Sequence, residues 1–284
     1  MEHTAGGPAR DEDDSKKMQD LSGKAAFITG GASGIGRAIA ESMVREGVSV
    51  AIADIDADAA ARTCKEIEAS GGRAVPVSCD VTQEKSVAQA ADEAAAALGE
   101  IQLLVNNAGA FMLAGLEDTT RSDWEWLLEV NVLGVVNGLH TFLPRMRAQD
   151  APCHIVNTAS VSGYVPTPGL SIYTASKFAV VGLTESLRVE LAGSAIGLSL
   201  LCPGIVSTGL LDSSRKHRAT RFGASAEGES PMGAVIAQGS DPAVLGDQVV
   251  EAVKAGEFYI FTHPGIRPAF EKRFNEILAA YHGD

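Results

Sequence analysis

The segment "FITGGASGIGRAIA", residues 27–40, constrains the fold more than any other part of this 284-residue sequence. A short apolar run ends in glycines, and apolar residues at helical spacing follow at once. Glycine allows the unusual backbone angles of a tight turn and lets the helix pack closely on the strand before it. The helix begins at this turn, so the positive end of its dipole and its free N–H groups are directed toward the turn. A phosphate group bound at the turn would be stabilised by both.

A tight structural turn is the alternative interpretation of these glycines. A strand before the glycines and a helix after them are, however, the context that dinucleotide binding requires. We therefore expect this turn to bind a cofactor pyrophosphate, through Gly30, Ser33, Gly34, Ile35 and Gly36.

The rest of the chain repeats the alternation of apolar runs and helical patterns. Continuously apolar runs indicate strands of a parallel sheet that is covered on both faces. We predict a single α/β domain, doubly wound and of Rossmann type, with seven parallel strands flanked by helices and ligands at their carboxyl ends. The predicted strands lie within residues 24–29, 48–54, 73–80, 101–109, 153–160, 196–204 and 257–263. The predicted helices lie within residues 36–47, 56–72, 82–100, 121–147, 173–192 and 268–282.

Two segments differ from this pattern. Residues 1–20 hold many charges and almost no apolar side chains, so we predict a disordered N-terminal tail before a catalytic domain of residues 21–284. Residues 205–245, rich in Ser, Gly and charge, form an irregular insert between the last two strands.

Composition excludes several classes of partner. The net charge of -13 disfavours nucleic acid and anionic membranes. No run reaches the ~18 apolar residues that span a bilayer, and the N-terminus lacks the pattern of a signal peptide. The four cysteines are scattered without a CxxC pair, which favours a reduced, cytoplasmic protein. No cluster has metal-ligand spacing, so we expect no metal.

Asp54 ends the second apolar run, 18 residues after Gly36. A carboxylate there can accept hydrogen bonds from both ribose hydroxyls of NAD, and it repels the 2′-phosphate of NADP. Capping the next helix is the alternative role. Ser33 and Ile55 occupy positions where NADP binding favours a basic residue, and Arg37 lies inside the helix. The sequence therefore favours NAD over NADP.

Several further motifs occur in a fixed order. They are "TGGASGIG" (29–36), "CDV" (79–81), "NNAG" (106–109), Asn131, Ser160, "YTASK" (173–177) and "PGIVST" (203–208). Together they make the chain resemble a short-chain dehydrogenase/reductase, clearly over about residues 21–204. The resemblance implies a homotetramer, or a dimer, with helices starting near Arg121 and Tyr173 at one interface, and an insert that covers the substrate.

The resemblance also implies roles for single residues. Asp80 would bind the adenine amino group and the backbone of Val81 the ring, while Asn107, Ala108 and Gly109 would line the adenosine ribose. The nicotinamide carboxamide would be held by Pro203, Gly204, Val206 and Thr208. Alternatively, "NNAG" mainly holds a strand end and Asp80 caps the helix that begins near Thr82.

Tyr173 and Lys177 stand four residues apart, on one face of a predicted helix. Oxidation of a secondary alcohol needs a base near neutral pH, and free tyrosine has a pKa of ~10. A lysine ammonium one turn away, with the positive ring of NAD⁺, can stabilise the phenolate. Ser160 can stabilise the developing alkoxide. The resemblance gives Asn131 a water-mediated relay from Lys177 and gives Lys177 contact with the ribose. An exposed helical surface is the alternative for the pair.

The expected reaction is hydride transfer between NAD and a small alcohol or ketone. Apolar residues at 111–113 and 164–165 indicate a fairly hydrophobic secondary alcohol or its ketone, although core or subunit contacts are equally compatible with them. The basic stretch 213–221 either contacts an anionic substrate or forms a solvated helix face. An NADP-linked carbonyl reductase and a non-catalytic dinucleotide sensor are the alternatives. The sequence does not name the substrate, the direction of reaction, or a role for His263 and Arg267.

Overall fold

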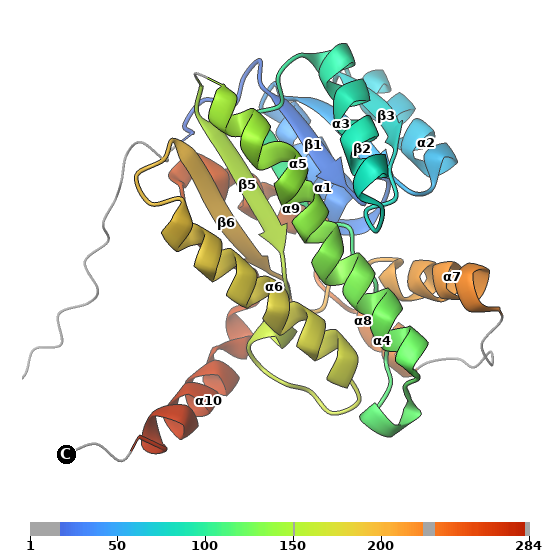
Figure 1. Cartoon of the computed structure of the whole chain (residues 1–284), viewed down its shortest axis with the longest axis vertical. Helices are drawn as coiled ribbons and strands as arrows, with labels where there is room; N and C mark the ends of the chain where they lie inside the picture. Colours follow the sequence, from blue (N-terminus) through green and yellow to red (C-terminus); the bar gives the residue numbers. More distant parts are fainter. Residues whose placement is uncertain (1–17, 150, 224–230, 282–284) are drawn as a thin grey trace, which may run out of the picture.

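The computed structural model describes residues 18–149, 151–223 and 231–281. Seven parallel strands form one sheet in the order β3-β2-β1-β4-β5-β6-β7, which confirms the predicted doubly wound fold (Figure 1). The strand order runs from β1 to β3 on one side and from β4 to β7 on the other. In such sheets ligands bind where the order reverses, here between β1 and β4. The strands are β1 (Ala25–Thr29), β2 (Ser49–Asp54), β3 (Ala74–Ser78), β4 (Leu103–Asn106), β5 (Cys153–Thr158), β6 (Ile196–Cys202) and β7 (Tyr259–Phe261).

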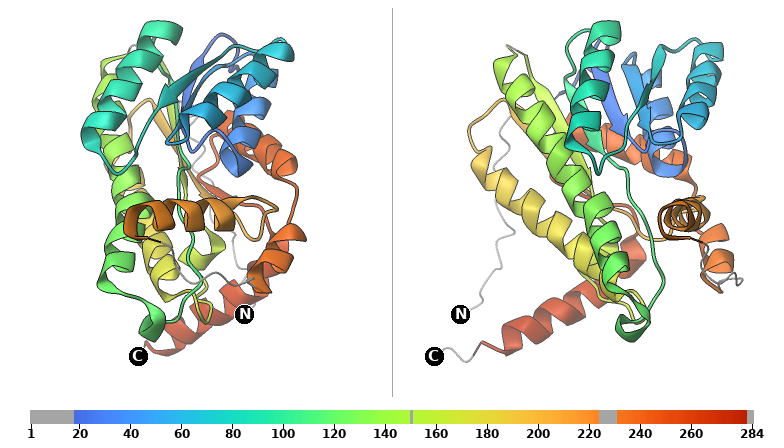
Figure 2. Two further views of the ribbon diagram at one scale, coloured as in Figure 1. Left: turned by 90° about the vertical axis from the view of Figure 1, so that its right-hand side faces the viewer. Right: turned by 45° about the vertical axis from the view of Figure 1, so that its right-hand side comes forward.

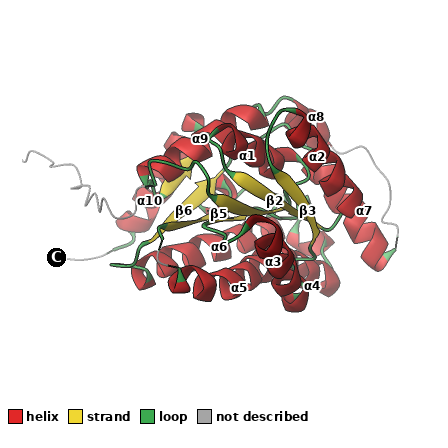
Figure 3. Ribbon diagram, turned by 90° about the horizontal axis from the view of Figure 1, so that it is seen from above, coloured by secondary structure: helices red, strands yellow, loops and turns green. Residues whose placement is uncertain are grey.

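Helices cover both faces of the sheet (Figure 3). One face packs against α1 (Gly34–Arg45), α2 (Ala57–Ala69) and α9 (Pro242–Ala255). The other packs against α3 (Glu84–Leu98), α5 (Gly134–Ala148) and α6 (Ser171–Glu190). The strand residues are therefore buried on both sides, which explains why their sequences are continuously apolar.

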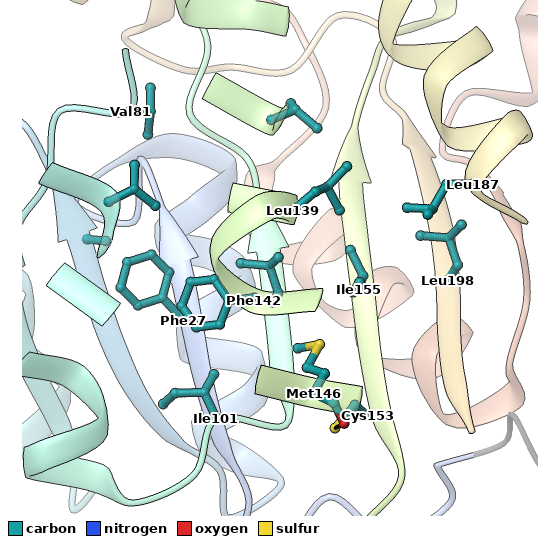
Figure 4. Close-up of a cluster of buried hydrophobic side chains, with 14 of the residues drawn as sticks. Phe27, Val81, Ile101, Leu139, Phe142, Met146, Cys153, Ile155, Leu187 and Leu198 are labelled. Carbon is teal, nitrogen blue, oxygen red and sulfur yellow. Dashed lines mark hydrogen bonds between the residues drawn. The ribbon is translucent and has the colours of Figure 1, made fainter. Parts of the chain in front are cut away.

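Two large apolar clusters hold these layers together. Between the sheet and α5, the rings of Phe27 and Phe142 lie 4.8 Å apart, and Met146 and Ile155 are buried nearby (Figure 4). All four cysteines are buried and free, and burial raises the pKa of the Cys202 thiol to about 12. These thiols therefore act as small apolar side chains of the core.

The predicted helix over 121–147 is one continuous helical segment in three parts. These are α4 (Arg121–Leu128), a π-helical stretch η3 (Glu129–Leu133) and α5. The segment is long and apolar enough to cross a membrane, but it packs along the sheet as a core helix of this domain. Asn131 is buried within the π-helical stretch, and such stretches are frequent at functional sites.

The predicted boundaries need two corrections. Residues 1–17 lie outside the described residues, but Met18, assigned to the tail, is only 3% exposed and packs in the core with Leu21. The insert 205–245 is partly helical, with α7 (Leu210–Phe222) and α8 (Pro231–Ala237), and its last residues already belong to α9. Burial of the apolar Met18 and Leu21 side chains explains the first difference.

The last helix, α10 (Arg267–Ala279), projects from the body of the molecule (Figure 2). None of its residues is buried. Phe270 near its start packs against Tyr164, with ring centroids 4.7 Å apart, while Phe274, Ile277 and Leu278 are exposed farther along.

Candidate active site

The glycine-rich turn has the geometry that close approach of a ligand requires. Gly30 and Gly34 adopt φ angles of +61° and +54°, which favour glycine. A Cβ atom on Gly36 would lie 2.3 Å from the carbonyl oxygen of Gly30. Ser33 is exposed at the start of α1, and its side chain caps none of the helix N–H groups. The first turn of α1 therefore keeps N–H groups available for a phosphate.

Asp54 stands at the end of β2, beside this turn. Its carboxylate accepts hydrogen bonds from the backbone N–H groups of Ala32 (3.1 Å) and Asp56 (3.0 Å). The alternative role as a helix cap is wrong, because Asp56 caps α2 by accepting from Ala59. Asp54 is instead held next to the glycines, where a ribose hydroxyl would be within its reach.

Arg37 is the nearest basic residue to the glycine turn along the chain. Its guanidinium pairs with Glu41 at 2.7 Å and with Glu66 at 2.6 Å. The hydrogen bond to Glu41 is the largest cause of the raised pKa of Arg37. The guanidinium of Arg37 is therefore already paired with two carboxylates.

The "CDV" and "NNAG" motifs lie at the ends of β3 and β4. Asp80 accepts hydrogen bonds from the N–H (3.0 Å) and hydroxyl (2.8 Å) of Thr82, whereas α3 has Gln83 at its N-cap. Asp80 thus stabilises the turn before α3 rather than the helix itself. The backbone carbonyl of Val81 accepts a hydrogen bond from the Asn137 side chain at 2.8 Å.

Asn107 connects β4 to the end of β1. Its amide nitrogen donates to the carbonyl groups of Thr29 (3.1 Å) and Gly30 (3.3 Å). The backbone N–H of Ala108 donates to the Thr29 hydroxyl at 3.0 Å. The structural role that the sequence left open for "NNAG" is therefore present, and a role in lining a ribose stays a prediction.

Ser160, Tyr173 and Lys177 meet at the carboxyl end of β5, and exposed fractions of 6%, 8% and 4% show that all are buried. Ser160 begins the short helix η4 (Val161–Gly163), while the other two lie in the first two turns of α6. The Lys177 ammonium donates to the carbonyl of Thr158 at 2.9 Å and lies 5.8 Å from the centre of the Tyr173 ring. The pair is therefore not an exposed helical surface.

Asn131 joins this group through a hydrogen-bond network. Its amide oxygen accepts from the Ala110 N–H at 2.7 Å, and its amide nitrogen donates to the Ala110 carbonyl (2.9 Å) and the Ser176 hydroxyl (3.0 Å). The Ser176 hydroxyl donates in turn to the carbonyl of Tyr173 at 2.7 Å. Asn131 thus binds the loop after β4 to the helix of Tyr173, and its water relay stays a prediction.

Burial shifts the pKa values of both Tyr173 and Lys177. Burial raises the pKa of Tyr173, and the nearby Ser160 hydroxyl opposes this only in part. Burial also lowers the pKa of Lys177 to about 8. In the cofactor-free chain the net shift of the Tyr173 pKa is therefore upward. The lowering expected from Lys177 together with the positive ring of NAD⁺ stays a prediction.

The loop after β6 closes the other side of the site. The Pro203 carbonyl accepts hydrogen bonds from the Ser160 hydroxyl (3.4 Å) and the Val161 N–H (2.9 Å). Thr208 lies against the glycine turn, since its methyl carbon would be 3.2 Å from a Cβ on Gly34. A hollow of about 410 Å³ opens beside Thr208, between α7 and α8.

The basic stretch of α7 is largely exposed, as a solvated helix face would be, and several of its side chains form ion pairs. Arg218 pairs with Asp123 at 2.6 Å, Arg221 with Glu129 at 2.7 Å, and Lys216 lies 3.8 Å from Asp56. The insert is therefore connected by ion pairs to α4 and η3 on one side and to the start of α2 on the other. Contact with an anionic substrate stays a prediction.

The apolar residues expected around the substrate divide into two groups. The Phe111 ring lies 4.9 Å from that of Tyr173, so it packs beside the Tyr–Lys pair, and its contact with substrate stays a prediction. Tyr164 belongs to the core instead, and its hydroxyl donates to Glu185 at 2.8 Å. Sequence reasoning missed Ser176 and Thr158, although Ser176 directly precedes Lys177.

These residues fit a nicotinamide dinucleotide. A side chain at Gly36 would fill the turn, α1 offers uncapped N–H groups, and Asp54 faces the same turn from β2. Among the described residues no three His, Cys, Asp or Glu side chains gather to hold a metal ion. The absence of a metal itself stays a prediction.

Comparison with known proteins decides the family. The family model described as "short chain dehydrogenase" matches residues 24–219. The chain belongs to the short-chain dehydrogenase family. Its sequence is 35% identical over 273 residues to a CLA biosynthesis dehydrogenase/reductase of Lactiplantibacillus plantarum, covering 92% of this chain and 95% of that protein. It is 33% identical over 267 residues to a C alpha-dehydrogenase of a Sphingobium species, covering 92% and 87%.

Solved structures agree with this assignment. A short-chain dehydrogenase/reductase from Burkholderia phymatum, in complex with NAD, is 38% identical with a TM-score of 0.87. The match covers 94% of this chain and 99% of that one. A putative short-chain dehydrogenase from Novosphingobium aromaticivorans is 35% identical with a TM-score of 0.81, covering 94% and 90%. The sequence resemblance to this family is thus confirmed.

Proposed function

We propose that this oxidoreductase transfers hydride between NAD and a fairly hydrophobic secondary alcohol or its ketone. The burial of Tyr173, Lys177 and Ser160 together at the carboxyl end of β5 carries this proposal. The names of several relatives as dehydrogenases support the reaction class. The NAD in the Burkholderia phymatum structure supports the cofactor.

The proposed chemistry assigns a role to each side chain. Tyr173 accepts the hydroxyl proton in alcohol oxidation and returns it in ketone reduction. Ser160 donates a hydrogen bond to the substrate oxygen and stabilises its developing negative charge. Lys177 holds a positive charge beside the phenol, and Asn131 holds the loop after β4 against the start of α6. NAD, when bound, accepts the hydride and brings a positively charged ring.

The cofactor residues are assigned by the same proposal. The phosphates bind at the turn of Gly30, Gly34 and Gly36 beside Ser33 and Ile35, and Asp54 binds the ribose. The adenosine is held by Asp80, Val81, Asn107, Ala108 and Gly109, and the carboxamide by Pro203, Gly204, Val206 and Thr208.

Preference for NAD rests on Asp54 and Arg37. The carboxylate of Asp54 is fixed beside the glycine turn, and the guanidinium of Arg37 is already paired with two glutamates. The NADP-linked reductase remains the competing proposal. Tighter binding of NADPH than of NADH, measured as the two Kd values, would favour that competitor.

A substrate screen tests the proposal directly. NADH absorbance would be followed over steroids, aromatic carbinols, cyclic diols and sugars, and over the matching ketones. Tyr173→Phe is the catalytic control and Tyr281→Phe, exposed beyond α10, is the matched control. We expect turnover with an apolar alcohol that only Tyr173→Phe abolishes. Near-full turnover by Tyr173→Phe would refute the mechanism, while binding without turnover would support a dinucleotide sensor.

We also propose a homotetramer in the cytoplasm. The helices α4 and α5 lie beside α6 on one face of the molecule, and Leu133 and Val189 are exposed there (Figure 1). Four buried free thiols suit a reducing compartment. Light scattering after size-exclusion chromatography gives the mass, and a monomer of 29.5 kDa would contradict the proposed assembly.

A further inference from the structure

His263 follows the edge strand β7 and is absent from every motif considered above. Its imidazole makes hydrogen bonds to the loop after β6. The backbone N–H of Gly204 donates to Nδ1 at 3.0 Å, and Nε2 lies 2.9 Å from the carbonyl oxygen of Ile205. A Cβ on Gly204 would lie 2.6 Å from the ring, so glycine is needed there to admit the imidazole.

The two backbone partners define the protonation of this ring. An N–H group can only donate and a carbonyl can only accept, so Nδ1 is unprotonated and Nε2 bears the hydrogen. The Thr262 hydroxyl, 2.7 Å from Nδ1, and the Ser240 hydroxyl, 3.0 Å from Nε2, complete the surroundings of the ring. The neutral imidazole is therefore the form that holds the loop.

These contacts orient two peptide groups of the loop. In a trans peptide the carbonyl and the following N–H point in opposite directions. With the Gly204 N–H toward His263, the Pro203 carbonyl points to Ser160 and Val161, as observed. With the Ile205 carbonyl toward His263, the N–H of Val206 is turned away from the ring.

The backbone of Ser240 supports the same orientation. Its N–H donates to the Ile205 carbonyl at 3.0 Å, and its carbonyl accepts from the Ser207 N–H at 3.0 Å. Residues 203–207 are thus held from one side by Ser160 and Val161 and from the other by His263 and Ser240. The imidazole of His263 contacts both the Gly204 N–H and the Ile205 carbonyl.

We propose that His263 is a positioning residue for the cofactor: its neutral imidazole orients the Gly204–Val206 backbone that would hold the nicotinamide carboxamide. This inference rests on the proposed function, which assigns these residues to the cofactor. Without the two hydrogen bonds to the His263 ring, the peptide groups of the loop after β6 can adopt other orientations. Cofactor affinity then falls although no group that touches the cofactor has been removed.

Two substitutions test the role. His263→Phe keeps an aromatic ring but removes both nitrogens, and His263→Asn keeps an acceptor close to the position of Nδ1. His140→Phe, exposed on α5, is the matched control. We measure the Kd for NADH by fluorescence titration, amide hydrogen exchange of residues 203–207 without cofactor, and the KM for NAD and kcat of an active alcohol.

His263→Phe should raise the Kd for NADH about tenfold and speed exchange in residues 203–207. It should raise the KM for NAD more than it lowers kcat. His263→Asn should restore part of the affinity, and His140→Phe should match the wild type. Wild-type affinity or unchanged loop exchange in His263→Phe would overturn the positioning role. If the wild-type protein bound neither NADH nor NADPH, the proposed function itself would fail, and the cofactor role of His263 with it.

Discussion

The guanidinium of Arg218 on α7 lies 2.6 Å from the carboxylate of Asp123 on α4. The Asp123 side chain is only 1% exposed, and burial acts to raise its pKa. Hydrogen bonds from Arg218 and Thr120 outweigh burial and hold the pKa of Asp123 below its usual value. The carboxylate therefore stays charged at neutral pH and connects the insert to the main body of the molecule.

Arg218→Ala should loosen the insert. The substitution leaves a buried carboxylate without its cation, so we expect the free energy of unfolding to fall by about 2 kcal/mol. We also expect faster proteolysis within residues 205–245. Urea denaturation and a timed digestion followed by mass spectrometry measure the two effects.

Arg215→Ala is the matched control, since Arg215 is exposed on the same helix. It should leave both measurements at the wild-type value. Equal stability and equal digestion of the Arg218→Ala and Arg215→Ala proteins would show that the ion pair does not hold the insert.

Asp54→Asn should change the choice of cofactor. The substitution removes the negative charge beside the glycine turn, so repulsion of a 2′-phosphate disappears and hydrogen bonds to the ribose weaken. We expect the ratio of the Kd for NAD to the Kd for NADP to rise at least about tenfold. Calorimetric titration of both cofactors measures the ratio. Asp58→Asn, exposed on α2, should not change it, and an unchanged ratio in Asp54→Asn would exclude the assigned role.

Local patterns were sufficient for the sheet and the main site residues. Continuously apolar strands and helical spacing lie within short segments, and the glycine turn and Tyr173–Lys177 pair are each contiguous in the chain. The direction of the crossovers then places these motifs at one edge of the sheet. The fold and the meeting of Ser160, Tyr173 and Lys177 were therefore predictable.

Contacts between distant segments were not predictable in this way. Arg218 and Asp123 are 95 residues apart, and His263 and Gly204 are 59 apart. The partners of such residues depend on the path that the insert and the C-terminal segment take through the fold. Local periodicity in the sequence does not determine that path. The π-helical stretch at Asn131 and the core position of Tyr164 likewise depend on packing against neighbouring elements.

His154, buried in β5, should make stability depend on pH. The Ser199 hydroxyl donates to the Glu257 carbonyl at 2.6 Å, so the His154 Nε2, 2.8 Å from it, bears the hydrogen and donates. Among the described residues its Nδ1 has no hydrogen-bond partner. Burial lowers the pKa of His154 to about 4, whereas an unfolded histidine has a pKa of about 6.5.

Between these pKa values the unfolded chain binds the additional proton, so the free energy of unfolding falls as pH decreases from about 6.5 to 4. We expect the wild type to lose about 3 kcal/mol more than His154→Gln over this window, at 1.36 kcal/mol per pKa unit. Urea denaturation at several pH values measures the loss. His140→Gln should follow the wild type, and parallel curves for wild type and His154→Gln would contradict the assignment.

Lys177→Met should stabilise the cofactor-free protein while it impairs catalysis. The Lys177 ammonium is buried, and burial lowers its pKa from 10.5 to about 8, which corresponds to about 3 kcal/mol of unfavourable burial of charge at neutral pH. Methionine fills similar space without charge but loses the hydrogen bond to Thr158. We therefore expect the free energy of unfolding at pH 7 to rise by about 1–3 kcal/mol.

The gain should depend on pH with a definite sign. Below about pH 8 both folded and unfolded wild type are protonated and the cost of burial is complete, whereas above about pH 10.5 both are neutral and it vanishes. The advantage of Lys177→Met should thus decline between these values. Lys85→Met, exposed on α3, should show no gain.

The same Lys177→Met protein should bind NADH more weakly, and its activity-versus-pH curve for alcohol oxidation should move to higher pH. Without the ammonium, the Tyr173 phenolate loses a stabilising charge and forms only at higher pH. A stability gain together with wild-type turnover at pH 7 would show that Lys177 is a buried charge without a catalytic role. A loss of stability at pH 7 would show that its ammonium mainly supports the fold.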